Sequence, residues 1–599
     1  MQTFKKLLFL LTSAEKKRLG LLMGMICVMA ILDMLGVASI LPFIAVLTTP
    51  DLVQNNIFLN VAYKKLEFDD PQQFLFALGM LLFVVLLVSL AFKALTTYAQ
   101  LRFTLMREYS IDKRLVEGYL HQPYSWFLSR NSADLGKNIF SEVGSVINNG
   151  FLPMLNLIAQ SLVTIALLTL LMFVDTKLTL LVILILATAY IFIFKAMKDH
   201  LVRIGVESVK ADRGRFVAIN EALSAFKEVK VAGLEQTYIK RFSDPARIFA
   251  RSQAMGQVIS QLPRFLIEIL SFSGILLLML YLIKHNSFTS PLPVIALYVF
   301  AGYRLLPALQ QIYAAFTQLR FVRPALDALH ADLMSLEPKN LNFNKDVIVL
   351  KQNIILNHIQ YSYPNAPKAV IKNLSLTIPA KSIVGFVGAT GSGKTTTVDL
   401  ILGLLKAEKG TLAVDDQVII EHNRRDWQRS IGYVPQQIYL ADDTVAANIA
   451  FGLEAEKIDQ KAVERAAKIA YLHDFVVNEM PQQYQTTVGE RGVRLSGGQR
   501  QRIGIARALY HRPQVLIMDE ATSALDNLTE QVIMEALNKE KYEITIILIA
   551  HRLSTVKTCD TIFLMERGEL KAQGTFDELI QTNELFQAMA RGSLYNNIK

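Results

Sequence analysis

A glycine-rich segment in the second half of the chain has the residue types that bind phosphate groups. It matches the P-loop pattern, in which glycines let backbone N–H groups surround a phosphate. Apolar runs at 382–387 and 396–405 flank it, which predicts a strand, a tight loop and a helix whose N-terminus faces the phosphate. Lys394 should reach the β- and γ-phosphates of a bound nucleotide, and Thr395 should bind Mg²⁺. The expected contacts are Gly388, Ala389, Thr390, Gly391, Ser392, Gly393, Lys394, Thr395 and Thr396.

Two carboxylates end another apolar run further along the chain. Residues 515–518 are Val, Leu, Ile and Met, and Asp519 and Glu520 follow them. Asp519 suits the oxygen shell of Mg²⁺, and Glu520 is placed to polarise an attacking water as a general base. Strands that end in acids are common in α/β folds. Together with a P-loop, this one indicates hydrolysis of a nucleoside triphosphate.

A third motif lies between these two. Residues 495–499 are Leu, Ser, Gly, Gly and Gln, directly before an expected helix at 500–510. Hydroxyl and backbone donors at a helix start can bind a phosphate. This motif, between a P-loop and a strand-terminal Asp-Glu, resembles the signature of the ATP-binding cassette (ABC) ATPases, and the resemblance covers essentially the whole C-terminal half. The residues concerned are Ser496, Gly497, Gly498 and Gln499.

The resemblance assigns roles to further residues. Tyr363 would stack on adenine, and Gln436 would contact Mg²⁺ and the attacking water. Asp526 would belong to the D-loop, and His551 would lie at the γ-phosphate. The segment 487–492 is similar to one found before the signature in exporters.

The family mechanism implies a dimer. In that mechanism two cassettes close head to tail, and each ATP lies between the P-loop of one and the signature of the other. One chain has one P-loop and one signature, so it cannot form a closed site alone. Because Glu520 and His551 are both present, a second copy of the same chain is favoured over a partner with one degraded site.

The composition indicates that the chain also crosses a membrane. Of its 599 residues 52% are hydrophobic and 19% are charged, whereas soluble domains have about 25% charged residues. This excludes a disordered chain, a fibrous protein and a purely cytosolic enzyme. The net charge of +10 fits the cytoplasmic loops of a membrane protein better than a nucleic-acid partner. Two cysteines, Cys27 and Cys559, form no disulfide framework.

Six apolar segments are long enough to span a bilayer, which needs about 20 residues per helix. Basic loops after the second and fourth segments, and an acidic loop at 51–70, place both termini on the cytoplasmic side of the membrane. We therefore expect a membrane bundle of six long helices over 1–335, a linker over 336–345, and an α/β P-loop domain over 346–599. The segments are 19–47, 73–99, 143–174, 176–197, 257–283 and 291–317.

The membrane half resembles the six-helix domain of ABC exporters. Residues 220–230 and 123–127 look like its two cytoplasmic coupling segments. The stretches 31–36, 41–44 and 303–307 are similar to bacterial flippases that translocate lipid-linked oligosaccharides (the PglK type). That resemblance implies a short external helix within 51–72 and an amphipathic, lipid-linked substrate.

Polar residues inside the apolar segments are candidates for substrate binding, because charges at bilayer depth are costly. Arg264 and Arg304 could grip a phosphate or pyrophosphate with bidentate hydrogen bonds. The alternative is that they snorkel or form structural pairs, as Arg264 would with Glu268. Asp33 and Lys93 are further intramembrane charges. A drug, lipid A or peptide exporter, or an ATP-gated channel or regulator, remains open.

Overall fold

The computed structural model divides the chain into two compact units. Unit 1 comprises residues 1–122 and 130–338, and unit 2 comprises 123–129 and 339–599. The structure describes residues 2–48, 53, 57–65, 68, 70–284, 292–336, 346–364, 366–520, 527–539, 544–550 and 552–596.

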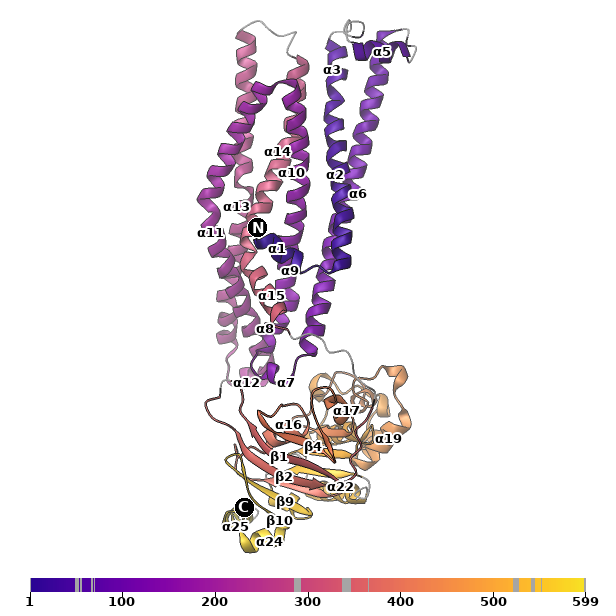
Figure 1. Ribbon diagram of the computed structural model, residues 1–599, viewed down its shortest axis with the longest axis vertical. Helices are drawn as coiled ribbons and strands as arrows, with labels where there is room; N and C mark the ends of the chain where they lie inside the picture. Colours follow the sequence, from indigo (N-terminus) through magenta and orange to yellow (C-terminus); the bar gives the residue numbers. More distant parts are fainter. Residues whose placement is uncertain are drawn as a thin grey trace. The chain divides into compact units, whose positions relative to one another are not determined.

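Unit 1 consists of helices, several of which are far longer than a bilayer requires. A 50-residue helix is about 75 Å long, more than twice the thickness of the hydrocarbon core. In unit 1, α11 lies beside α13, α10 beside α14, and α2 beside α6 (Figure 1). The helices are α1 (Gln2–Phe9), α2 (Ser13–Ala38), α3 (Ile40–Thr48), α5 (Ile57–Lys65), α6 (Pro71–Leu120), α8 (Ser132–Lys137), α9 (Val143–Val146), α10 (Leu152–Val174), α11 (Thr176–Ser224), α12 (Phe226–Val231), α13 (Glu235–Lys284), α14 (Leu292–Phe321) and α15 (Arg323–Ser335).

Within the described residues, four helical stretches are long and apolar enough to cross a membrane. The expected fifth and sixth spans fall on α13 and α14, where the side chains of residues 274–296 lie outside the described part. The external helix expected within 51–72 corresponds to α5. The four stretches are Ser13–Thr48, Gln72–Leu120, Ser132–Val174 and Thr179–Ser224.

Local sequence signals fix where these helices begin. Thr12 and Glu15 form a capping box at the start of α2, and Asp70 caps α6 ahead of Pro71. Both devices satisfy backbone N–H groups that have no partner within the helix. The third spanning stretch is less regular, because π-helical turns η1 (Asn138–Glu142) and η2 (Ile147–Phe151) lie on either side of α9.

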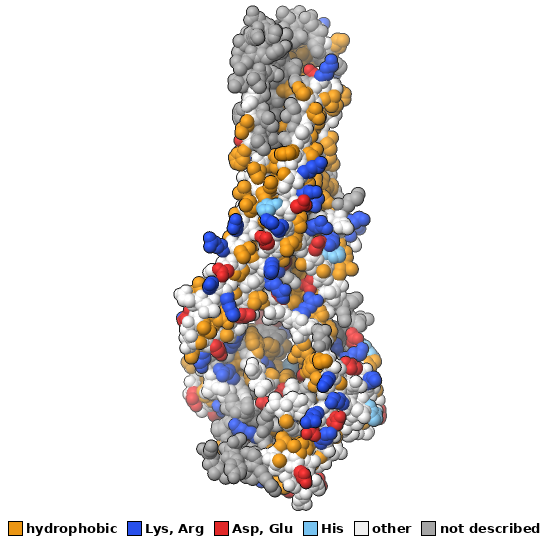
Figure 2. Space-filling model, turned by 90° about the vertical axis from the view of Figure 1, so that its left-hand side faces the viewer, with side chains coloured by type: hydrophobic (Ala, Val, Ile, Leu, Met, Phe, Trp, Pro, Cys, Tyr) orange, Lys and Arg blue, Asp and Glu red, His pale blue; other side chains and the backbone are white. Residues whose placement is uncertain are grey.

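The surface of unit 1 changes character along the helices. Figure 2 shows hydrophobic side chains over the part nearer the end where α13 stops and α14 starts, and charged side chains toward the end with α8 and α12. Large apolar side chains of the membrane-spanning stretches are exposed, among them Phe76, Phe83, Phe173 and Phe192. Such an exposed apolar surface is what a lipid bilayer covers.

Unit 2 contains two β-sheets. The first is antiparallel, in the order β2-β1-β4-β5, and the second has the order β10-β9-β3-β8-β7-β6, with only β10 antiparallel to its neighbour. The strands are β1 (Asn353–Tyr361), β2 (Ile371–Pro379), β3 (Ile383–Val387), β4 (Lys409–Val414), β5 (Gln417–Val418), β6 (Ile431–Val434), β7 (Val515–Asp519), β8 (Thr545–Ile549), β9 (Thr561–Glu566) and β10 (Glu569–Gly574).

Both faces of the second sheet are covered, one by helices and the other by helices together with the first sheet. This explains why β3, β7 and β8 are apolar throughout and buried at every position, as expected of parallel strands. The helices of unit 2 are α7 (Tyr124–Leu128), α16 (Lys394–Ile401), α17 (Arg424–Gln428), α18 (Val445–Ile449), α19 (Gln460–Ile469), α20 (His473–Glu479), α21 (Gly497–Leu509), α22 (Asn527–Lys539), α23 (Leu553–Val556), α24 (Phe576–Thr582) and α25 (Glu584–Asn596).

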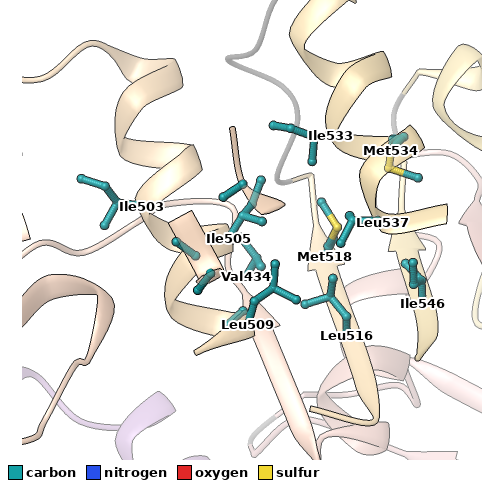
Figure 3. Packing of buried hydrophobic residues seen from close by; sticks show 14 of the residues in the cluster. Val434, Ile503, Ile505, Leu509, Leu516, Met518, Ile533, Met534, Leu537 and Ile546 are labelled. Carbon is teal, nitrogen blue, oxygen red and sulfur yellow. The ribbon is translucent and has the colours of Figure 1, made fainter. Parts of the chain in front are cut away.

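Two hydrophobic cores flank the second sheet, one on each side. Alternate residues of β7 enter them, Leu516 and Met518 on one side and Ile517 on the other. Figure 3 shows the first core, in which α21 and α22 pack against β6, β7 and β8. In the second core the indole of Trp427 donates a hydrogen bond to the Ile401 carbonyl at 2.7 Å. These cores hold the ends of β3 and β7 in fixed positions.

The two stretches likened to coupling segments are short helices. Residues 220–230 cover the end of α11, a bend at Ala225, and α12. Residues 123–127 fall almost entirely on α7, which groups with unit 2 although its chain neighbours on both sides belong to unit 1. The expected linker 336–345 lies outside the described residues except for Leu336.

Candidate ATP site

The P-loop joins β3 to α16 by a turn that needs glycine at defined positions. Gly388, Gly391 and Gly393 all have positive φ angles, of 150°, 78° and 102°, a region that other residues rarely adopt. A Cβ atom at Gly388 would lie 2.2 Å from the backbone oxygen of Met565. Only glycine therefore fits, and the loop can wrap a phosphate with its N–H groups.

Lys394 is the first residue of α16 and folds back over the loop. Its side chain is 5% exposed, and Nζ donates hydrogen bonds to the carbonyl oxygens of Gly388 at 2.8 Å and Ala389 at 3.1 Å. Burial lowers the pKa of Lys394, although the negative charges of Glu520 and Asp519 oppose that shift. The buried hydroxyl of Ser392 has no hydrogen-bond partner among the described residues. A buried cation and an unsatisfied hydroxyl in one loop fit an anionic phosphate.

The acidic pair lies where parallel strands end. Asp519 is the last residue of β7 and 6% exposed. Glu520 follows with φ of 49°, and its N–H donates to the Ile549 carbonyl at the end of β8 at 3.2 Å. The Gln436 side chain donates from Nε2 to Oε2 of Glu520 at 2.9 Å. The fold thus brings together two expected catalytic residues that are far apart in the sequence.

The oxygen donors near this edge fit a magnesium ion that is shared with nucleotide phosphates. The set expected from the sequence is a hydroxyl, an amide and a carboxylate, from Thr395, Gln436 and Asp519. Mg²⁺ prefers such hard oxygen ligands and is commonly held by one or two carboxylates plus substrate phosphates. The described residues contain no group of three or more His, Cys, Asp or Glu that could hold a metal alone. The expected ligands therefore suit an Mg²⁺ ion that is also coordinated by the phosphates of ATP.

Tyr363 lies beside the first turn of α16. Its hydroxyl is 3.0 Å from the hydroxyl of Thr396, and its ring meets that of Tyr361 edge-on at 5.2 Å between centroids. This places the aromatic expected to stack on adenine next to the end of the P-loop.

Sequence reasoning missed Asp399, an acid on α16 that is 9% exposed. Burial raises its pKa to about 6, and the negative charge of Asp519 adds to the shift. The signal was present, because Asp399 is a charged residue within the apolar run 396–405 that was expected to be a buried helix.

The signature motif forms the start of α21. Ser496 is the N-cap: the N–H of Gln499 donates to its hydroxyl at 3.2 Å, and its own N–H donates to the Gln499 side chain at 2.8 Å. Gly497 and Gly498 occupy the first turn, so the helix begins three residues earlier than the start expected at 500. This capping box leaves glycine N–H groups at a helix N-terminus, which suits an anion.

Arg507 connects the same helix to the segment that follows Gln436. It donates from Nε to the Asn448 carbonyl and from Nη1 to the Tyr439 carbonyl, both at 2.8 Å. Its guanidinium lies 4.4 Å from the ring centroid of Phe451, and burial lowers its pKa to about 10. Sequence reasoning did not identify this residue.

Two further expected residues, Asp526 and His551, lie outside the described part of the chain. The strand that precedes His551 in the chain, β8, ends at Ile549, whose carbonyl accepts the hydrogen bond from the N–H of Glu520.

The intramembrane charges of unit 1 fall into two separate groups. Asp33 on α2 is 1% exposed and receives a hydrogen bond from Ser89 at 2.9 Å; Lys93 and Arg304 each lie 3.5 Å from its carboxylate. We call Asp33, Ser89, Lys93 and Arg304 the Asp33 cluster.

Arg264 is not part of the Asp33 cluster. It pairs with Glu268 at 2.7 Å one turn along α13, and both side chains are about half exposed. The two arginines expected to grip substrate thus have different partners, and Lys93 joins one of them.

Comparison with known proteins shows which families and relatives this chain is similar to. Two family models match the chain: one described as ABC transporter transmembrane region, over residues 28–308, and one described as ABC transporter, over residues 371–523. An ATP-dependent lipid A-core flippase of Cupriavidus metallidurans is 31% identical over 487 residues, or 80% of each chain.

Two other similarities extend over most of the chain. The chloroplastic ABC transporter B family member 29 of Arabidopsis thaliana is 32% identical over 446 residues, covering 74% of this chain and 69% of that protein. A solved structure of a bacterial Atm1-family ABC exporter with ATP bound superposes with a TM-score of 0.77, covers 97% and 99% of the two chains, and is 23% identical. That structure shows that the fold is shared.

Proposed function

This chain belongs to the ABC transporter family and couples ATP hydrolysis to transport, and from that premise we propose that two identical copies form a lipid flippase of the bacterial inner membrane. The observation that carries the lipid part of the proposal is the Asp33 cluster. It contains two cations and one carboxylate among apolar helices. An excess positive charge at that depth is costly unless an anion neutralises it.

The cassette residues receive the following roles in this proposal. Glu520 acts as general base, with Gln436 holding its carboxylate and orienting the attacking water. Lys394 and the loop N–H groups bind the β- and γ-phosphates, and Tyr363 stacks on the adenine. His551 contacts the γ-phosphate and Asp526 lies at the dimer seam. Support comes from the 2.9 Å hydrogen bond between Gln436 and Glu520 and from the buried Lys394.

The ATP site is completed by the partner copy. Ser496, Gly497, Gly498 and Gln499 start α21, and in the dimer they would face the nucleotide held by the other P-loop. Mg²⁺, held by Thr395, Gln436 and Asp519 with the phosphates, would supply charge neutralisation.

The substrate we propose is a lipid with a phosphate-containing headgroup and attached sugars. Arg304 is 18% exposed and Lys93 is 35% exposed, so both side chains retain surface with which to meet a headgroup. An arginine binds phosphate oxygens in a bidentate manner, whereas a lysine acts as a point charge. Arg264 is a second candidate contact, but it must first release Glu268.

Two lipid classes meet this description. A pyrophosphate-linked oligosaccharide lipid is the first candidate, on the resemblance of the first and sixth spans to flippases of that type. A lipid A-core glycolipid is the second, favoured by the names of relatives such as those from Cupriavidus metallidurans and Aliivibrio fischeri. We also propose the domain boundaries 1–335, 336–345 and 346–599, with both termini in the cytoplasm.

Flipping assays in proteoliposomes distinguish the candidates. Fluorescent pyrophosphate-linked oligosaccharide lipid and fluorescent lipid A-core are supplied separately, with ATP. Arg304→Gln should reduce flipping of the true substrate about tenfold or more, because one charge-assisted bidentate contact is lost. Glu520→Gln should abolish flipping while ATP stays bound, and Arg102→Gln, an exposed cation on α6, should have no effect.

Three results would contradict the proposal. ATP-dependent transport of neither lipid would reject the flippase assignment. Normal flipping by Arg304→Gln would reject the headgroup contact. ATP turnover by a stable single copy in the membrane would reject the shared site.

A further inference from the structure

Unit 1 contains a large cavity, and one of its lining residues, Leu305, directly follows Arg304 of the Asp33 cluster in the chain. Its volume is about 1070 Å³, which is at the upper end of the range for small-molecule pockets. Residues of α1, α10, α11 and α14 line it, together with Arg323 at the start of α15. No residue of the Asp33 cluster is among the lining residues.

Most of the cavity wall is apolar and open on one side. Ile191 on α11 and Phe316 on α14 both line it and are 54% and 45% exposed. The Tyr190 hydroxyl, also in the wall, is buried and without a hydrogen-bond partner among the described residues. A wall of this composition fits a hydrocarbon chain better than a polar solute.

One part of the wall is strongly basic. Lys195, Lys198, Arg320 and Arg323 line the cavity, and only Arg323 has a carboxylate nearby, Asp327 at 3.8 Å. That carboxylate is itself bound by Lys6 of α1 at 2.6 Å. Among the described residues, the other three cations form no ion pair. Uncompensated positive charge next to an apolar wall calls for a ligand that is anionic at one end and apolar at the other.

These cations lie where two apolar segments end. Lys195 and Lys198 lie at the end of the apolar segment 176–197 on α11, and Arg320 and Arg323 follow the apolar segment of α14. Basic residues at the cytoplasmic ends of spans lie at the level of lipid headgroups. Gln2, Thr3 and Phe4 of α1 also line the cavity.

We propose that the cavity holds a resident anionic phospholipid of the cytoplasmic leaflet, with an acyl chain along α11 and α14 and its phosphate at Lys195, Lys198 and Arg320. The inference rests on the proposed function only in placing this end of the helices at the cytoplasmic interface. The bilayer's own anionic lipids are favoured as occupants because the three cations face a leaflet in which such lipids are abundant. None of these three cations belongs to the Asp33 cluster proposed for the transported lipid.

Native mass spectrometry of the full-length protein tests the proposal with two defined lipids, phosphatidylglycerol and phosphatidylcholine. The wild type should bind phosphatidylglycerol about tenfold more tightly, since each cation contributes to attraction of an anionic headgroup. The preference should vanish in the variant Lys195→Gln, Lys198→Gln, Arg320→Gln. It should persist in a matched control that neutralises three exposed cations elsewhere on unit 1, Lys16→Gln, Lys17→Gln, Arg102→Gln.

A second variant tests the apolar part. Ala187→Trp places a large ring in the cavity wall and should reduce binding of both lipids while the cations remain. Inorganic phosphate at millimolar concentration should displace neither lipid, because it lacks the chain.

Several outcomes would overturn the proposal. Equal affinity for the two lipids would do so, as would displacement by inorganic phosphate, which would indicate a free-anion site. Crosslinks from a photoactivatable phosphatidylglycerol that avoid α11 and α14, or a second copy of the chain covering Ile191, would do the same. Because these are binding measurements, their failure is distinguishable from a failure to flip either glycolipid.

Discussion

Asp399→Asn should stabilise the nucleotide-binding unit at neutral pH. Asp399 is buried on α16, and its pKa is raised to about 6 by burial and by the charge of Asp519. At pH 7.5 the Asp399 carboxylate is therefore charged in the folded chain, although burial and the negative charge of Asp519 both disfavour that charge. A shift of about two pKa units corresponds to about 3 kcal/mol, an upper limit for what the charge costs. Asparagine keeps the side-chain shape and removes the charge.

The sign of the pH dependence follows from the raised pKa. Between the ordinary value of 3.8 and about 6, the folded chain binds a proton that the unfolded chain releases, so the contribution of Asp399 to stability falls as pH rises through this window. The variant lacks this dependence. The difference in stability between variant and wild type should thus be small at pH 4, grow up to pH 6 and stay constant above it.

Tryptophan fluorescence can follow unfolding of this unit in the full-length protein. The chain has two tryptophans, Trp126 and Trp427, and both belong to unit 2. Nucleotide-free protein in EDTA should show a melting temperature several degrees higher for Asp399→Asn at pH 7.5, since 1 kcal/mol shifts a domain of this size by about 2–4 °C. Asp416→Asn, at an exposed position of the same unit, should change nothing.

Either of two results would contradict the predicted effect of Asp399→Asn on stability. One is a melting temperature at pH 7.5 that is unchanged or lower in Asp399→Asn. The other is a gain in stability that is the same at pH 4 as at pH 7.5, because a pH-independent gain cannot come from removing a titrating charge.

Three further substitutions test the cassette. Gly388→Ala introduces a Cβ 2.2 Å from a backbone oxygen and should weaken ATP binding by about tenfold or more; normal binding in a filter assay would refute the close approach. Ser496→Ala removes the cap of α21, at a cost of about 1 kcal/mol, and should lower ATP turnover while leaving binding to the P-loop intact; unchanged turnover would argue against a role for the motif. Arg507→Met leaves the carbonyl groups of Tyr439 and Asn448 without their donor and should cost about 2–4 kcal/mol in urea unfolding, so a loss below about 1 kcal/mol would show that the network contributes little.

The P-loop, the acidic strand end and the signature were predictable because their function depends on local residue order. Glycine at 388 and 393 indicates a backbone conformation that other residues rarely adopt. An apolar run indicates a buried strand or a membrane helix, even when the fold is not known. The family resemblance and the two-part fold are confirmed by the family models and by the shared exporter structure. The relatives support a lipid flippase in general, whereas the oligosaccharide-linked substrate stays a prediction.

Contacts between distant segments could not be predicted in the same way. Asp33, Ser89 and Arg304 come from three helices, and a single sequence carries no signal for their register. The sequence suggested that Arg264 and Arg304 act together, with a pair between Arg264 and Glu268 as the alternative. The structure confirms the pair of Arg264 with Glu268, whereas the pairing of Arg304 with Asp33 was not predicted. The roles expected for Asp526 and His551 also stay predictions, since both lie outside the described residues.

The π-helical turns η1 and η2 give the third spanning stretch a property that a straight helix lacks. A π-turn places an extra residue in one turn, so the chain from Asn138 to Phe151 is shorter along its axis than ordinary helix of the same length. If one π-helical turn converted to α-helix, its extra residue would lengthen the helix by about 1.5 Å and rotate the residues beyond it by about 100° about the helix axis. We expect this helical stretch to be able to lengthen and to rotate one end relative to the other while its backbone hydrogen bonds remain formed.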